Sequence, residues 1–241
     1  MEKNLTIGSV FKNVILFSLP YLLSYFLQTL YGMADLFIIG QFEGVASTTA
    51  VSIGSQVMHM LTVMIVRLAM GTTVSIGQAI GAGDRKQAAK DIGNTVTLFM
   101  AVSIALIAFL LVLVHPIISA MSTPTEAVKG TSAYLTICFI GVPFITAYNI
   151  ISSIFRGMGD SESPMYFIAV ACAANIGLDY LFMGILRLGP AGAALGTTLS
   201  QAVSVAVSLT VILKRKKIVL KEDDFKPYRP VMGKILKIGV P

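Results

Sequence analysis

The chain has 241 residues, of which 55% are hydrophobic and 12% charged, and its mean hydropathy is +0.81. Soluble domains carry roughly 25% charged residues, so a soluble globular fold of this composition would lack polar surface. The net charge of +6 does not indicate a nucleic-acid partner, because most basic residues flank apolar segments instead of clustering on one soluble surface.

Six segments have the length and composition of membrane-spanning helices. A helix needs ~20 mainly apolar residues to cross the hydrocarbon core of a bilayer. Stretches rich in Gly and Pro separate the segments, as expected for helix ends. We therefore predict an all-α membrane protein with six transmembrane helices, near residues 14–39, 49–80, 91–114, 131–155, 164–186 and 190–213.

The basic residues predict the orientation of these helices. If successive connections lie on opposite sides of the membrane, 15 of the 18 Lys and Arg residues lie on the side of the N-terminus, and Lys129 and Arg187 lie on the other. The positive-inside rule then places the N-terminus in the cytoplasm, with the protein in the cell (inner) membrane. The basic run 214–217 could also contact anionic membrane lipid.

The end of the sequence resembles its beginning. Residues 12–20 and 234–241 each run from a Lys through apolar residues and a small residue to a Pro, and the two prolines are 221 positions apart. This pattern indicates a parallel repeat whose second copy has just begun. We expect a cytoplasmic segment 1–13, a six-helix unit 14–213, a basic cytoplasmic linker 214–230 and the start of a seventh helix at 231–241.

Two carboxylates lie within the predicted spans. A charge at the bilayer centre costs ~2.5–3.5 kcal/mol on insertion scales, so such residues are candidates for function. Tyr31 and Gln28 precede Asp35 by four and seven residues, and Asn175 precedes Asp179 by four, so each set shares one helix face. These faces could bind a proton or a small cation, or could instead join helices through hydrogen bonds.

Arg67 is the one basic residue predicted near the middle of a span. An intramembrane Arg pairs with a carboxylate or faces a water-filled cavity. One hypothesis is an ion pair with Asp35 or Asp179 that protonation would release. The alternative is an Arg that faces water or polar backbone near one end of a tilted helix.

Catalytic and cofactor motifs are not recognisable in the sequence. The glycine-rich stretch 81–83 lacks the Lys-Ser/Thr ending of a phosphate-binding loop. The two cysteines, Cys138 and Cys172, and the two histidines lack the spacing of metal ligands. We therefore expect neither an enzyme nor a bound cofactor.

Taken together, several motifs resemble a known transporter family. They are residues 19–20 and 28–35 in the first span, the connection 77–84, the connection 156–164, and residues 175–179 and 192–197 in the last two spans. In this order they cover essentially the whole chain. The chain resembles the prokaryotic multidrug and toxic compound extrusion (MATE) transporters, of which it would form the N-terminal six-helix half.

This resemblance implies a V-shaped protein of two six-helix lobes that exports small-molecule drugs and organic cations while protons or sodium ions flow inward. The coupling-ion site of the family would here consist of Asp35, Asn175 and Asp179, with Tyr31 and Thr197 as neighbours. From their positions within the spans, and not from the resemblance, we expect Gln28 and Arg67 to contribute to gating or to the substrate cavity.

Two features depart from the family pattern. Arg67 is not expected in the second helix, and the chain ends where a seventh helix begins. The sequence could therefore be a fragment, a split gene product, or a half-size protein that pairs with itself or with another half. A flippase for lipid-linked precursors and a non-transporting membrane subunit remain alternative functions.

Overall fold

The computed structural model describes residues 9–215 and 221–239, and the regular structure in these ranges is helical. Five helical segments are long and apolar enough to cross a membrane, and a bent pair of helices makes a sixth. The predicted all-α, six-span lobe is therefore confirmed. In order, the elements are α1 (Val10–Phe42), α2 (Val45–Gly81), α3 (Arg85–Ala120), α4 (Thr125–Ile140), α5 (Val142–Gly157), α6 (Glu162–Asp179), η1 (Tyr180–Ile185), α7 (Gly189–Arg215), η2 (Glu222–Phe225) and α8 (Arg229–Gly239).

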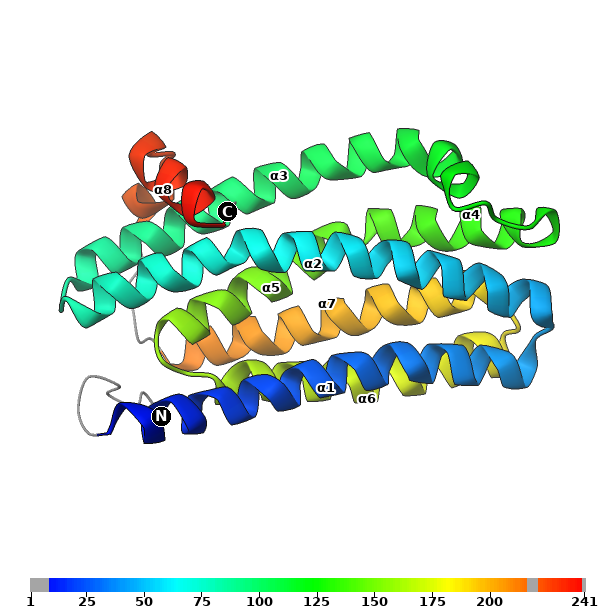
Figure 1. The fold of residues 1–241 in the computed structure, drawn as a ribbon, viewed down its shortest axis with the longest axis horizontal. Helices are drawn as coiled ribbons and strands as arrows, with labels where there is room; N and C mark the ends of the chain where they lie inside the picture. Colours follow the sequence, from blue (N-terminus) through cyan, green and yellow to red (C-terminus); the bar gives the residue numbers. More distant parts are fainter. Residues whose placement is uncertain (1–8, 216–220, 240–241) are drawn as a thin grey trace.

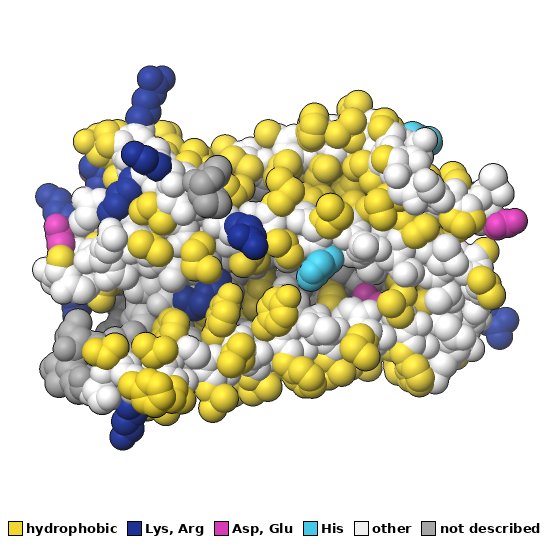
Figure 2. Space-filling view, viewed as in Figure 1, with side chains coloured by type: hydrophobic (Ala, Val, Ile, Leu, Met, Phe, Trp, Pro, Cys, Tyr) yellow, Lys and Arg dark blue, Asp and Glu magenta, His cyan; other side chains and the backbone are white. Residues whose placement is uncertain are grey.

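The long helices lie side by side in a bundle (Figure 1). The start of α1 and the C-terminal α8 lie at the same end of this bundle (Figure 1). Hydrophobic side chains cover much of its outer surface, while Lys and Arg gather mainly at the end that carries α8 (Figure 2). This distribution suits a protein whose flanks face lipid. Lys216, Lys217 and Pro241, used in the basic-run and repeat predictions, lie outside the described residues.

The fourth span is broken, which the sequence analysis did not anticipate. α4 and α5 meet at an angle of 50° around Gly141. Pro143 lacks a backbone N–H, so it cannot continue the helical hydrogen-bond ladder at this point. The missing side chain of Gly141 also leaves room for Thr198 of α7, because a Cβ there would lie 2.6 Å from its methyl carbon.

The predicted helix end is correct at the glycine-rich turn between α2 and α3. It is wrong at Pro116, where a single proline had been taken to end the helix. Between α2 and α3, Gly83 adopts a φ of 76°, and Asp84 caps α3 by accepting a hydrogen bond from the Gln87 backbone N–H at 2.9 Å. α3 instead continues through Pro116 to Ala120. The predicted end of this span near residue 114 was therefore several residues too early.

The segment before α8 packs against α3 through polar contacts. The Asn94 side chain accepts a hydrogen bond from the Tyr228 backbone N–H at 2.7 Å and donates one to the Asp224 carbonyl at 3.2 Å. The Lys90 ammonium lies 3.6 Å from the centre of the Tyr228 ring, a cation–π contact. A Cβ on Gly93 would overlap the Asp224 carbonyl, so only glycine permits this approach. This part of the basic linker is thus fixed to the lobe.

Replacing Asn94 by Ala should release this segment from α3. Each of the two lost hydrogen bonds contributes about 1 kcal/mol, so the backbone amide of Tyr228 should exchange with solvent deuterium measurably faster. Hydrogen–deuterium exchange of the peptide that contains residues 226–232 checks this. Gln78→Ala, at an exposed position of α2, is the control and should leave the exchange rate unchanged. Equal rates in Asn94→Ala and native protein would contradict the docking.

Candidate functional site

Three helices bring the predicted polar residues together in the bundle. Asp35 comes from α1, Asn175 and Asp179 come from α6, and Thr197 comes from α7. The Thr197 hydroxyl donates a hydrogen bond of 3.2 Å to Oδ2 of Asp35. Asp35 also interacts with Asp179 and Asn175 across the α1–α6 interface. The two acids that the sequence placed in separate spans therefore share one site.

The backbone of α7 passes directly beside the Asp179 carboxylate. A Cβ on Gly196 would overlap Oδ1 of Asp179 and would lie 3.6 Å from the Asn175 amide nitrogen. Glycine is therefore required at this position for the carboxylate to fit between the helices. In the sequence, Gly196 was noted only as part of the stretch 192–197 that resembles the transporter family.

A π-helical turn begins immediately after Asp179. α6 ends at this residue and η1 continues the helix over Tyr180–Ile185 with wider hydrogen-bond spacing. Such turns change the rotation of the residues that follow and are frequent at functional sites. The residues of this segment are apolar throughout, so their pattern does not indicate the turn.

The site contains an unusual group of buried polar atoms. Asp35, Asn175 and Asp179 are at most 2% exposed. Among the described residues, five of their side-chain atoms have no hydrogen-bond partner: Oδ1 of Asp35, both carboxylate oxygens of Asp179, and both polar atoms of the Asn175 amide. Buried polar atoms are rarely left without partners, because desolvation costs about 1–3 kcal/mol for each. This arrangement suits the binding of a proton or a small cation.

Tyr31 connects this polar cluster to α7. Its hydroxyl donates to the Thr197 carbonyl at 3.3 Å and lies 3.4 Å from the Ser200 hydroxyl. Tyr31 and Thr197, predicted as neighbours of the acids, are thus in contact with each other, and Thr197 also contacts Asp35. Ser200 was missed because a serine in a helix is common and carries no distinctive spacing.

A cavity of about 500 Å³ opens beside the cluster, lined by α1, α2, α4, α5 and α7. Asp35, Tyr31, Gln28 and Arg67 all contribute to its wall. Figure 2 shows a hollow on this face of the molecule, with Lys or Arg side chains inside it. The cavity is therefore lined both by three of the residues predicted for coupling, Tyr31, Asp35 and Thr197, and by Gln28 and Arg67, which were predicted for gating or substrate contact.

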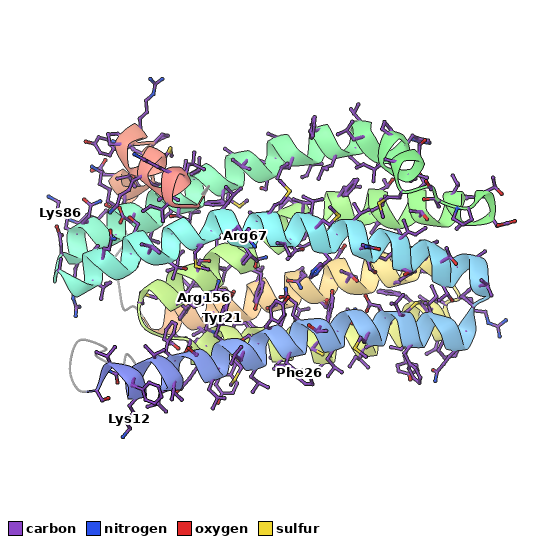
Figure 3. The ribbon with its side chains drawn as sticks, in the orientation of Figure 1. Lys12, Tyr21, Phe26, Arg67, Lys86 and Arg156 are labelled. Carbon is purple, nitrogen blue, oxygen red and sulfur yellow. The ribbon has the colours of Figure 1, made fainter. Side chains whose placement is uncertain are left out.

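The predicted ion pair of Arg67 is not present. Arg67 is exposed to the cavity and, among the described residues, makes no ion pair with Asp35 or Asp179. Arg67 instead lines a cavity, as an intramembrane Arg without an acidic partner is expected to do. Arg156, which the sequence analysis assigned to a connection, lies in the last turn of α5 and lines the same cavity. Figure 3 shows both arginines and Tyr21 in the space between α1 and α2.

Comparisons with known proteins identify the family. The MatE family model matches residues 20–181. The chain is 32% identical to the Probable multidrug resistance protein YpnP of Bacillus subtilis over 98% of its own length and 53% of the relative's. It is 30% identical to the Probable multidrug resistance protein NorM of Thermotoga maritima over 95% of its own length and 50% of the relative's.

The fold gives the same result. A solved outward-facing multidrug resistance MATE family transporter of the MOP superfamily superimposes with a TM-score of 0.89 at 28% identity, covering 97% of this chain and 52% of that one. The chain belongs to the MatE family of multidrug efflux transporters. It spans about half the length of the curated relatives it matches, and its helices correspond to the N-terminal lobe.

Replacing Gly196 by Ala should displace the Asp179 carboxylate. The overlap with Oδ1 of Asp179 corresponds to overpacking, which costs roughly 1–3 kcal/mol, so thermal stability in detergent should fall. Gly177→Ala is the matched control, because its Cβ would meet nothing within 4 Å and Ala favours the helix by about 0.5–1 kcal/mol. A melting temperature lowered equally by both variants would show that Gly196 has no special contact.

Proposed function

We propose that this lobe supplies the ion-coupling site and part of the substrate cavity of an exporter that exchanges protons or sodium ions for small amphipathic drugs. The family resemblance implies that organic cations are among these drugs. The observation that carries the proposal is the buried pair Asp35 and Asp179, which has unpartnered oxygens among the described residues and of which Asp35 lines the cavity.

Proton binding has a direct physical basis in this cluster. Two carboxylates in close contact within an apolar bundle repel one another, and neither can donate a hydrogen bond while both are ionised. One proton would remove the repulsion and supply the missing donor. Besides Asp179, the titratable groups that interact with Asp35 among the described residues are Tyr31, Tyr134, Cys138 and Cys172.

Sodium binding is supported by the same atoms. Hard cations prefer oxygen ligands, and the carboxylates, the Asn175 amide oxygen and the Thr197 hydroxyl are all oxygen donors in one cluster. Asn175 Oδ1 and both Asp179 oxygens have no protein partner among the described residues. The donor set is therefore compatible with either coupling ion, which would be cargo of the transport cycle.

Coupling to substrate follows from where Asp35 lies. It contacts α6 and α7 through the polar cluster and also lines the cavity through α1. An ion that changes the charge of the cluster changes how α1 packs against α6 and α7. The cavity wall then differs between the ion-bound and the ion-free state. The substrate therefore binds the two states with different affinities, as ion–substrate exchange requires.

The complete transport unit requires a second wall to the cavity. Alternating access moves one repeat or bundle against another around a central site. We propose that a second six-helix half, or a second copy of this chain, supplies that wall. The gathering of basic residues at the α8 end (Figure 2) supports placing this end, with the N-terminus, on the cytoplasmic side of the cell membrane.

Replacing Asp35 or Asp179 by Asn should abolish ion-driven export while leaving drug binding in place. The effect of the coupling ion on drug affinity, on the order of tenfold for typical coupled sites, should disappear because an amide does not titrate. Export from proteoliposomes that contain the complete natural protein, driven by an imposed proton or sodium gradient, measures this. Glu126→Gln, an exposed position at the start of α4, is the control.

Imposing a proton gradient or a sodium gradient separately shows which of the two ions drives export. Export that requires an inward proton gradient and ignores sodium identifies proton coupling, and the reverse identifies sodium coupling. Full gradient-driven export by Asp179→Asn would contradict the assigned site. Absence of gradient-driven export in the native protein, with drug binding intact, would instead support a non-transporting subunit.

A further inference from the structure

The charged side chains that are accessible from the cavity are mainly basic. Four charged or titratable groups other than tyrosine line it: Asp35, His59, Arg67 and Arg156. Asp35 is only 2% exposed and its Oδ2 accepts a hydrogen bond from Thr197, so its carboxylate offers little surface for direct contact with a bound molecule. His59 and Arg67 are exposed, and Arg156 is half-buried. A bound molecule therefore meets guanidinium groups before it meets a carboxylate.

Neither arginine is neutralised by an acidic side chain within residues 9–215 and 221–239. Arg156 donates a hydrogen bond of 3.0 Å to the Ser153 hydroxyl, and its guanidinium lies 5.4 Å from the centre of the Tyr21 ring. Among the described residues, neither Arg156 nor Arg67 pairs with an acid. A guanidinium has five N–H donors, so most of those on the two side chains remain available to a ligand.

The surroundings hold Arg156 in place for such a contact. The Tyr21 ring on α1 makes a cation–π contact with its guanidinium, and Ser153 lies one turn before it on α5. Figure 3 shows Arg67 on α2 across the cavity from this pair. Two guanidinium groups that line one cavity suit a carboxylate or phosphate, which arginine binds through paired hydrogen bonds.

The rest of the wall suits an apolar body. Apolar and aromatic side chains from α1, α2 and α5 line the same cavity, namely Tyr25, Met58, Val63, Val66, Met70 and Tyr148. Methionine and tyrosine adapt to varied apolar shapes. The cavity thus combines an anion-binding end with a surface for hydrophobic groups.

We propose that the cavity takes substrates that carry a carboxylate or phosphate on an apolar body, with Arg67 and Arg156 binding the anionic group. This inference rests on the proposed export function and specifies its substrate class. It differs from the organic cations that the family resemblance implies, because a cation in this cavity would face two unpaired arginines.

The test compares two xanthene dyes of similar shape and opposite charge, carboxyfluorescein and tetramethylrhodamine methyl ester. Binding of each to the complete natural protein is measured by fluorescence polarisation in nanodiscs of zwitterionic lipid. The native protein should bind the anionic dye more tightly. Arg67→Gln should weaken anionic binding by about tenfold, the factor that corresponds to roughly 1.4 kcal/mol, and should leave cationic binding equal or tighter.

Three further variants test whether anionic binding depends on the guanidinium groups of the cavity. Arg67→Lys should retain part of the anionic binding, because the charge remains and the paired hydrogen bonds are lost. Arg156→Gln should act in the same direction as Arg67→Gln, and cationic-dye binding by each variant shows that it is folded. Lys129→Gln, which removes an exposed charge on α4 away from the cavity, should change neither dye. Tighter binding of the cationic dye by the native protein, or equal weakening of both dyes in Arg67→Gln, would overturn the proposal.

Two sources could supply the anionic group, and the lipid composition distinguishes them. If phosphatidylglycerol in the nanodisc competes with the dye in the native protein but not in Arg67→Gln, the ligand is a lipid headgroup. If added phosphatidylglycerol has no effect, the ligand is a water-soluble anion. Cationic-dye export driven by an ion gradient without anion binding would overturn this inference and leave the proposed function intact. Anion binding without ion-driven export would overturn the proposed function and support the binding of an anionic ligand in the cavity.

Discussion

The candidate site is built around the interaction between Asp35 and Asp179. Each carboxylate alone would be expensive in an apolar bundle, and together they repel when both are ionised. The structure nevertheless places them next to one another, at most 2% exposed, and three of their four oxygens have no hydrogen-bond partner in the part of the chain that the structure describes. A protein that only needed to join α1 to α6 would do so more stably with apolar or amide side chains. The arrangement is therefore best explained by an ion that comes and goes.

The helices around this contact are shaped to permit it. Gly196 lets the backbone of α7 pass beside Asp179, and the π-helical turn changes the geometry of α6 immediately after the same residue. The fourth span bends at Gly141, where Thr198 of α7 fills the space that a side chain would occupy. These irregular features lie along α7 or against it. A change in the charge of the cluster would therefore act on a helix that also lines the substrate cavity.

Sequence reasoning predicted the features that follow from period and composition. Six spans, the pairing of Asn175 with Asp179 on one face, and the importance of Asp35 all follow from helix length, helical spacing and the cost of burying charge. The bend at Pro143 and the π-helical turn depend on tertiary packing that leaves no periodic signal. Arg156 was assigned to a connection because its neighbours are glycines. Only the three-dimensional arrangement shows that it shares a cavity with Arg67.

Infrared difference spectroscopy of the purified complete protein across a pH step tests the central claim most directly. A protonated carboxylic acid has a C=O stretching band that ionisation removes. The account predicts such a titrating band in the native protein, its loss when Asp35 and Asp179 are both replaced by Asn, and its suppression by sodium at fixed pH if sodium binds the same oxygens. A band that persists unchanged in the double variant would contradict the claim, because the titrating proton would then reside elsewhere.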